Sequence, residues 1–273
     1  MPPLPPSSVA SDAALRPHRR RFASLRTIIA LMLREMATTY GRSPGGYVWA
    51  VLQPVAGVAL LAGLFSLAFR NPPLGVSFPL FYATGVVPFL MYMGISGRVS
   101  MSIIFSRPLL AYPSVTFMDA LLARFVLNFL TEVMVAYIIF AGILLLFDTR
   151  AILDLPSILL SLGLAGALAL GLGTLNCYLF TRFPIWQQVW SILMRPVFLV
   201  SCVLTVFDSM PRFAREILWY NPLVHLIGLM RRGFYTSYDA PYASPLYVIT
   251  VSAVCLVMGL ILLRRNQYQL LNL

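Results

Sequence analysis

The chain has 273 residues, of which 59% are hydrophobic and only 11% charged, and its formal net charge is +11. This composition excludes an ordinary soluble domain and predicts an all-α protein that crosses a membrane several times. All 20 basic residues are arginines, and because a P-loop needs a lysine, the chain is not expected to hydrolyse ATP itself. Cys177, Cys202 and Cys255 lie in apolar segments without metal-type spacing, so neither a metal site nor a disulfide framework is expected.

The N-terminal segment, residues 1–21, is rich in proline and serine and then basic, and we expect a disordered cytoplasmic tail. Residues 22–40 follow with apolar side chains at helical spacing, and Arg26 and Arg34 lie off this stripe. The pattern predicts an amphipathic helix in the membrane interface, with its arginines at anionic headgroups. Such a helix can be a simple anchor or an element that contacts a cytosolic partner.

The remainder, within one transmembrane domain over residues 22–273, contains apolar segments near the length of about 20 residues that a bilayer requires. We predict six transmembrane helices, over residues 47–69, 78–96, 117–147, 155–180, 185–207 and 246–263. In the fourth, Gly163, Ala167 and Gly171 are spaced four apart, which predicts a face for close helix packing. The loop over residues 97–113 is a natural docking surface for a cytosolic subunit.

Charged residues inside these segments are candidates for ion pairs or for a wet path through the membrane. Arg124, Asn128 and Glu132 share one face of the third predicted helix. An Arg124–Glu132 bridge through Asn128 and a role toward substrate are both open. Arg195 lies near the middle of the fifth predicted helix, where it can pair with Glu132 or line a substrate route.

The segment 210–235 is apolar, yet its longest charge-free run, Ile217–Met230, has only 14 residues and contains Asn221 and Pro222. The residue before a proline is disfavoured in helical geometry. We therefore predict two short helices, broken at Asn221-Pro222, that enter one leaflet and return; an interfacial helix is the alternative. Backbone at that depth must face protein or a wet cavity, which points to a pore mouth or a binding cavity.

The arginines also predict the orientation. With both termini in the cytoplasm, 14 arginines lie on the inner side and 6 on the outer side. This distribution follows the positive-inside rule.

Several sequence stretches occur in a specific order: LREMATTYG and GYVWAVLQP (33–54), FYATGVVPFLMY (81–92), LLARF (121–125), PIW and RPVFLVSC (184–202), and WYNPLVHLIGLMRRGFY (219–235). Together they resemble the permease subunits of bacterial ABC-2 type polysaccharide exporters, and in particular the inner-membrane permease of group 2 capsular polysaccharide export. The resemblance runs from about Ala23 to the C-terminus. Gln53 and Gly228 stand where relatives can carry acidic residues, so no role is assigned from those acids.

The resemblance implies a homodimer that works with two copies of a separate ATPase, which binds ATP and Mg²⁺, and no cofactor on this chain. It implies that the helix 22–40 and the loop 97–113 contact the ATPase, with Arg34, Arg98 and Arg107 as candidate coupling residues. The resemblance further implies that paired helices around Asn221 and Pro222 cap the channel. It also implies a periplasmic adaptor and an outer-membrane channel that continue the path.

The implied substrate is a lipid-linked anionic glycan and not a nucleic acid. Cations along its route would offset the loss of hydration, and aromatic rings could stack against sugars. The candidate substrate-path residues are Arg195, Trp219, Tyr220, Arg231, Arg232, Phe234 and Tyr235. Arg231 and Arg232 can alternatively anchor to lipid headgroups.

Other functions fit less well. Export of O-antigen or teichoic acid is the alternative within the same class. A secondary transporter would show inverted repeats and coupling-ion carboxylates, and a lipid-modifying enzyme would show clustered His and Asp residues. His18 lies in the tail, and His225 is isolated in an apolar run, where we expect a hydrogen-bonded structural residue. The sequence thus predicts a transport subunit in a bacterial inner membrane and not an enzyme.

Overall fold

The computed structural model describes residues 23–40, 46–68, 72–110 and 115–272, and this part of the chain is helical without any strand. The predicted tail, residues 1–21, lies outside the described residues. The helices are α1 (Ala23–Tyr40), α2 (Tyr47–Ala68), α3 (Phe78–Ser100), α4 (Ser102–Leu110), α5 (Phe117–Leu146), α6 (Leu155–Arg182), α7 (Pro184–Val200), α8 (Arg212–Leu218), α9 (Pro222–Phe234) and α10 (Pro245–Asn272). A short 3₁₀ turn, η1 (Phe207–Ser209), precedes α8.

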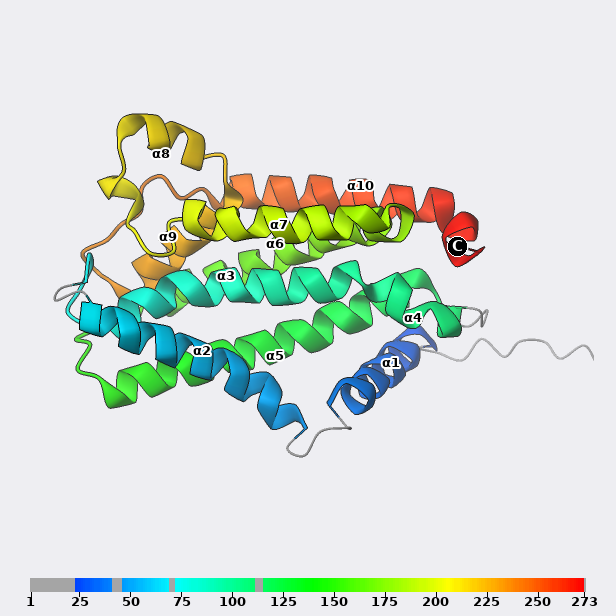
Figure 1. The fold of residues 1–273 in the computed structure, drawn as a ribbon, viewed down its shortest axis with the longest axis horizontal. Coiled ribbons are helices and arrows are strands. Elements are labelled where there is room, and N and C mark those ends of the chain that lie inside the picture. Colours follow the sequence, from blue (N-terminus) through cyan, green and yellow to red (C-terminus); the bar gives the residue numbers. More distant parts are fainter. Residues whose placement is uncertain (1–22, 41–45, 69–71, 111–114, 273) are drawn as a thin grey trace, which may run out of the picture.

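The long helices run along one axis of the molecule, and the short helices gather at its two ends (Figure 1). The helix α6 packs against α3, α9 and α10, and α3 packs in turn against α5 and α2. At one end lie α8 and α9; at the other lie α1, α4 and the C-terminal end of α10 (Figure 1). The bundle therefore separates two groups of short helices (Figure 1).

Four helical stretches are long and apolar enough to cross a membrane: Phe78–Leu110, Phe117–Leu146, Leu155–Arg182 and Pro245–Asn266. They match the second, third, fourth and sixth predicted spans. In the most apolar window of the first stretch 78% of the residues are buried within the protein, against 22% in the last. Hence α3 lies in the interior of the bundle, whereas α10 lies at its edge, packed against α6.

Of the other two predicted spans, the first contains a shorter apolar helical stretch, and the fifth overlaps α7, which is not among the helices long and apolar enough to cross a membrane. The helix α2 covers the predicted span at 47–69 and includes the apolar stretch Val51–Leu64. The helix α7 ends at Val200, before the predicted limit at 207. The chain then turns at residues 201–205, where Cys202 has a φ of 58°, in the left-handed region.

Side chains mark where two of the helices begin. The Asp119 backbone N–H donates to Thr116 Oγ1 at 3.2 Å, and the Thr116 N–H donates to the Asp119 carboxylate at 3.0 Å, so α5 starts with a capping box. The Leu223 N–H donates to Asn221 Oδ1 at 3.1 Å, and Pro222 occupies the first position of α9. The predicted break into two helices at Asn221-Pro222 is therefore present.

The predicted small-residue face on α6 is only partly correct. A Cβ atom added at Gly171 would overlap the backbone carbonyl of Ser252 on α10, but one added at Gly163 would meet nothing within 4 Å. From the other side, a Cβ at Gly259 would lie 2.7 Å from the Leu175 backbone nitrogen. The helices α6 and α10 thus meet backbone to backbone at Gly171 and Gly259, and Gly163 faces away from this contact.

Candidate functional site

An ion pair joins α1 to α5 at the end of the bundle that holds α4. The Arg124 Nε atom lies 3.1 Å from Glu35 Oε1 and 3.2 Å from Oε2. Both residues are buried, with 7% and 2% of their surfaces exposed. Arg124 Nη1 also donates to the backbone carbonyl of Arg98, near the end of α3, at 3.0 Å. One guanidinium group therefore links α1, α3 and α5.

The helix α4 contacts the same guanidinium through the ring of Phe105. The guanidinium carbon of Arg124 lies 4.2 Å from the centroid of the Phe105 ring on α4, and that of Arg34 lies 5.4 Å from the same ring. Both separations are within the range of a cation–π contact. We call Arg34, Glu35, Phe105 and Arg124, with the Arg98 carbonyl, the Arg124 cluster.

The predicted bridge from Arg124 to Glu132 is wrong. Arg124 turns toward α1, and Asn128 Nδ2 donates to the Arg124 backbone carbonyl at 2.7 Å. Glu132 lies two turns further along α5 against Gly94 of α3, where an added Cβ would overlap its carboxylate. Spacing along one helix indicates only which residues share a face, and the partner of Arg124 is 89 residues away in the sequence.

The helix α1 is oriented by this contact. Its buried positions are Leu31 and Glu35, whereas the apolar stripe of Leu25, Ile29, Leu33 and Met36 is between 37% and 62% exposed. The ion pair thus faces the bundle, and the apolar stripe is exposed on the other side of the helix.

At the opposite end, Arg231 is fully buried and bound to backbone. Its Nη1 atom donates to the Thr205 carbonyl at 2.6 Å, and Nη2 donates to the Val203 carbonyl at 2.9 Å. The guanidinium carbon lies 4.5 Å from the centroid of the Phe81 ring on α3. Arg231 therefore fastens the turn after α7 to both α9 and α3. The neighbouring Arg232 is exposed, so the two arginines have different surroundings.

His225 joins α9 to the segments on either side of it. The Ser244 N–H donates to His225 Nδ1 at 3.1 Å, so the ring proton is on Nε2, which donates to the Trp219 carbonyl at 2.8 Å. The ring is buried between Trp219 and Tyr247, with centroid separations of 5.4 Å and 5.2 Å. This neutral histidine has the hydrogen-bonded structural position expected from the sequence.

The remaining substrate-path candidates divide by exposure. Arg195 on α7 is exposed, as is Tyr220, and Trp219 is half-buried. The Trp219 and Tyr220 rings meet edge to face at 5.6 Å, just before the Asn221-Pro222 break. Phe234 and Tyr235 are buried, and Phe234 packs on Phe140 of α5.

The three coupling candidates come from helices that share one end of the bundle (Figure 1). Arg34 on α1 and Arg98 on α3 are half-buried, and Arg107 on α4 is exposed. Glu35, which the sequence interpretation did not select, binds Arg124, and the Arg124 guanidinium contacts all three helices. The signal of Glu35 in the sequence is its isolation, since it is the one acidic residue between Asp12 and Asp119.

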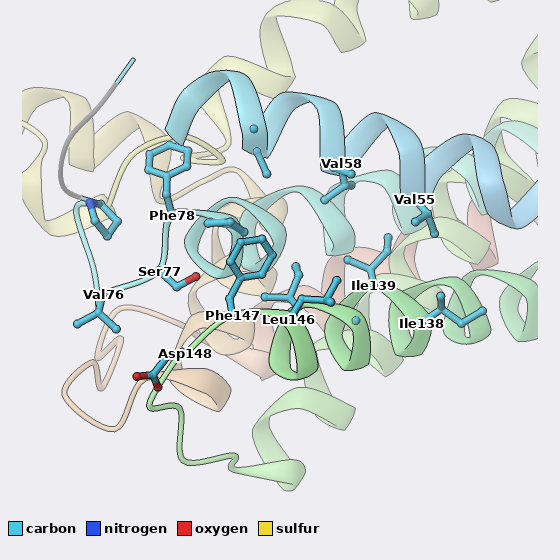
Figure 2. A pocket seen from close by; sticks show the side chains of 17 residues that line it. Val55, Val58, Val76, Ser77, Phe78, Ile138, Ile139, Leu146, Phe147 and Asp148 are labelled. Carbon is cyan, nitrogen blue, oxygen red and sulfur yellow. The ribbon is translucent and has the colours of Figure 1, made fainter. Parts of the chain in front are cut away.

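A cavity of about 580 Å³ opens between α2 and α5 (Figure 2). Val55 and Val58 of α2 face Ile139 of α5 across it, and Asp148 lies at its edge. The lining is almost entirely apolar, so the cavity suits a hydrocarbon chain and lacks the convergent polar groups that a glycan would need.

Residues 26–235 match the model of the ABC-2 type transporter family, and the chain belongs to this family. It is 30% identical to the polysialic acid transport protein KpsM of Escherichia coli over 246 residues, which are 90% of this chain and 95% of KpsM. It is 27% identical to the capsule polysaccharide export inner-membrane protein CtrC of Neisseria meningitidis serogroup B, covering 86% of this chain and 89% of CtrC. It is 24% identical to the capsule polysaccharide export inner-membrane protein BexB of Haemophilus influenzae, covering 88% and 90% of the two chains. These similarities confirm the resemblance drawn from the sequence motifs.

The contrast between Arg231 and Arg232 gives a matched pair of variants. We expect Arg231→Gln to lower stability, because two buried carbonyls lose their donor and each such loss costs about 1–3 kcal/mol. Arg232→Gln, at an exposed position, should remain within about 0.5 kcal/mol of the parent protein. The melting temperatures of the two purified variants test this, and equal values would contradict the structural role of Arg231.

Proposed function

We propose that this chain is the membrane-spanning subunit of an ATP-driven exporter, and that it moves lipid-linked capsular polysaccharide from the cytoplasm across the inner membrane. The main support for this proposal is the similarity to KpsM, CtrC and BexB over most of each chain, together with membership of the ABC-2 type family. O-antigen or teichoic-acid export is the alternative, and the names of these relatives favour capsule. The chain is a transport subunit and not an enzyme.

The proposed assembly contains two copies of this chain and two copies of a separate ATPase, which holds the ATP and Mg²⁺. The absence of lysine from the sequence supports a separate ATPase, since the P-loop lysine contacts the nucleotide phosphates. The helices α1 and α4 and the end of α3 are the proposed contact with the ATPase, through Arg34, Arg107 and Arg98 respectively. A periplasmic adaptor and an outer-membrane channel complete the export path.

The proposed topology has six membrane spans, formed by α2, α3, α5, α6, α7 and α10, and both termini in the cytoplasm. At 1.5 Å per residue, α7 has a length of about 26 Å and α2 about 33 Å, close to the hydrocarbon thickness of about 30 Å. The helices α8 and α9 form the re-entrant pair on the periplasmic side. Support comes from their position at the opposite end from α1 and α4 (Figure 1) and from the positive-inside rule.

The proposed substrate path uses side chains that the bundle leaves accessible. Arg195 and Arg232 would offset the charge of the glycan, while Trp219 and Tyr220 offer rings for sugars to stack on. Arg231, Phe234 and Tyr235 lie behind this surface and would support its shape. The exposed Arg195 and Arg232 are thus the proposed contacts with the glycan, and the buried Arg231 holds the structure behind them.

The assembly proposal is tested by ATP hydrolysis and capsule display. We expect the purified chain alone to hydrolyse no ATP, and its complex with the ATPase to hydrolyse ATP and restore surface capsule in cells that lack the permease. Arg107→Glu should weaken ATPase binding by up to about fivefold, as reversal of one exposed charge allows. Arg150→Glu, at an exposed position in the loop before α6, is the control. ATP hydrolysis by the isolated chain, or loss of O-antigen in place of capsule, would overturn the proposal.

The topology is tested by thiol labelling. In a variant without Cys177, Cys202 and Cys255, single cysteines at Tyr220 and Thr236 should both react with a membrane-impermeant reagent from the periplasmic side, because a re-entrant pair returns to the face it entered from. A cysteine at Arg107 should react only from the cytoplasm and serves as the control. Reaction of positions 220 and 236 from opposite faces would show that α9 spans the membrane.

The charge of the substrate path is tested by neutralisation. We expect Arg195→Gln and Arg232→Gln each to lower the amount of surface polysaccharide by about two- to fivefold, which is the scale of one exposed charge interaction. Arg150→Gln, an exposed arginine in the loop before α6, is the matched control. Amounts of permease and ATPase are measured in parallel. Unchanged export in both variants would show that neither arginine contacts the glycan.

A further inference from the structure

The helix α1 is held to the bundle mainly by one neighbour. It packs chiefly against α5, with a smaller contact to α2. The Glu35–Arg124 ion pair lies in the α1–α5 contact, and most of the apolar side chains of α1 point away from it. The position of α1 therefore depends on a charged contact more than on apolar packing.

A buried ion pair contributes little net stability, because the cost of removing two charges from water offsets most of the energy of their attraction. It does restrict geometry, since a displaced carboxylate would leave the guanidinium charge buried without a partner. In the Arg124 cluster two further contacts involve the same guanidinium: the carbonyl of Arg98 accepts from it, and the Phe105 ring packs on it. Few relative positions of α1, α3, α4 and α5 satisfy all of them.

We propose that Arg124 is a positioning residue that, through Glu35 and Phe105, holds α1 and α4 as one unit so that ATPase movement is transmitted to α3 and α5. This inference rests on the proposed function, in which α1 and α4 contact the ATPase. Without the ion pair, the ATPase could move α1 while α3 and α5 stay in place. The expected defect is therefore hydrolysis without export.

The test uses the full complex of permease and ATPase, with ATP hydrolysis and exported polysaccharide measured on the same samples. In Glu35→Gln and in Arg124→Gln, we expect the ATPase to remain bound and active while the amount of glycan exported per ATP hydrolysed falls by at least about fivefold, the lower end of usual coupling between sites. The double variant should be no worse than either single variant, because both remove the same contact. Asp239→Asn removes an exposed carboxylate at a distant loop and should leave the ratio unchanged.

A second variant avoids leaving a charge buried without its partner. Phe105→Leu keeps the Glu35–Arg124 pair and most of the apolar volume but removes the aromatic face under both arginines. We expect it to assemble at normal levels and to show the same direction of change in the ratio. This result distinguishes a loss of transmission from a failure to fold.

Each outcome decides between the alternatives. An unchanged ratio of export to hydrolysis in Phe105→Leu and in the ion-pair variants overturns the inference. A fall of both activities in proportion to the amount of assembled protein also overturns it, since that is what a merely structural contact would give. A parent complex that exports no glycan of any class refutes the proposed function instead, whatever the variants do.

Discussion

Backbone polar groups that meet no water must find partners inside the chain, and this constraint shapes the whole bundle. Within a helix the requirement is met locally, but wherever a helix ends some other group must serve. After α7 the guanidinium of Arg231 binds the carbonyls of Val203 and Thr205. At the start of α9 the side chain of Asn221 takes this role. Both side chains therefore bind backbone groups that lie outside the regular hydrogen bonding of the helices.

The same constraint explains why the charged residues of the bundle interior are bound to backbone as well as to each other. Arg124 serves a carboxylate and a carbonyl at once, and Arg231 serves two carbonyls. Arginine suits such positions because its planar guanidinium presents several donors in a fixed arrangement and also stacks on aromatic rings. The absence of lysine from the sequence agrees with this use of arginine.

Much of the fold could be predicted because apolar length and proline position act locally. Four spans and the break at Asn221-Pro222 follow from such signals. Contacts between distant segments could not be predicted in the same way. The spacing of Arg124 and Glu132 indicated a shared face and so suggested the wrong partner for Arg124. Gly163 fits the small-residue spacing, but among the described residues no other helix approaches it closely. The different burial of Arg231 and Arg232, adjacent in sequence, depends on the turn after α7, which no local pattern specifies.

The helix α3 carries a contact with one of the two arginines near each of its ends. The Arg98 carbonyl binds Arg124, and the Phe81 ring lies against Arg231, with about 26 Å of helix between them at 1.5 Å per residue. The two contacts are joined by a single helix, with no loop between them. Pro88 lies between the two contacts and has no N–H to give to the backbone hydrogen bonds of the helix. Because one hydrogen bond is missing there, α3 can bend at Pro88 more readily than along the rest of its length.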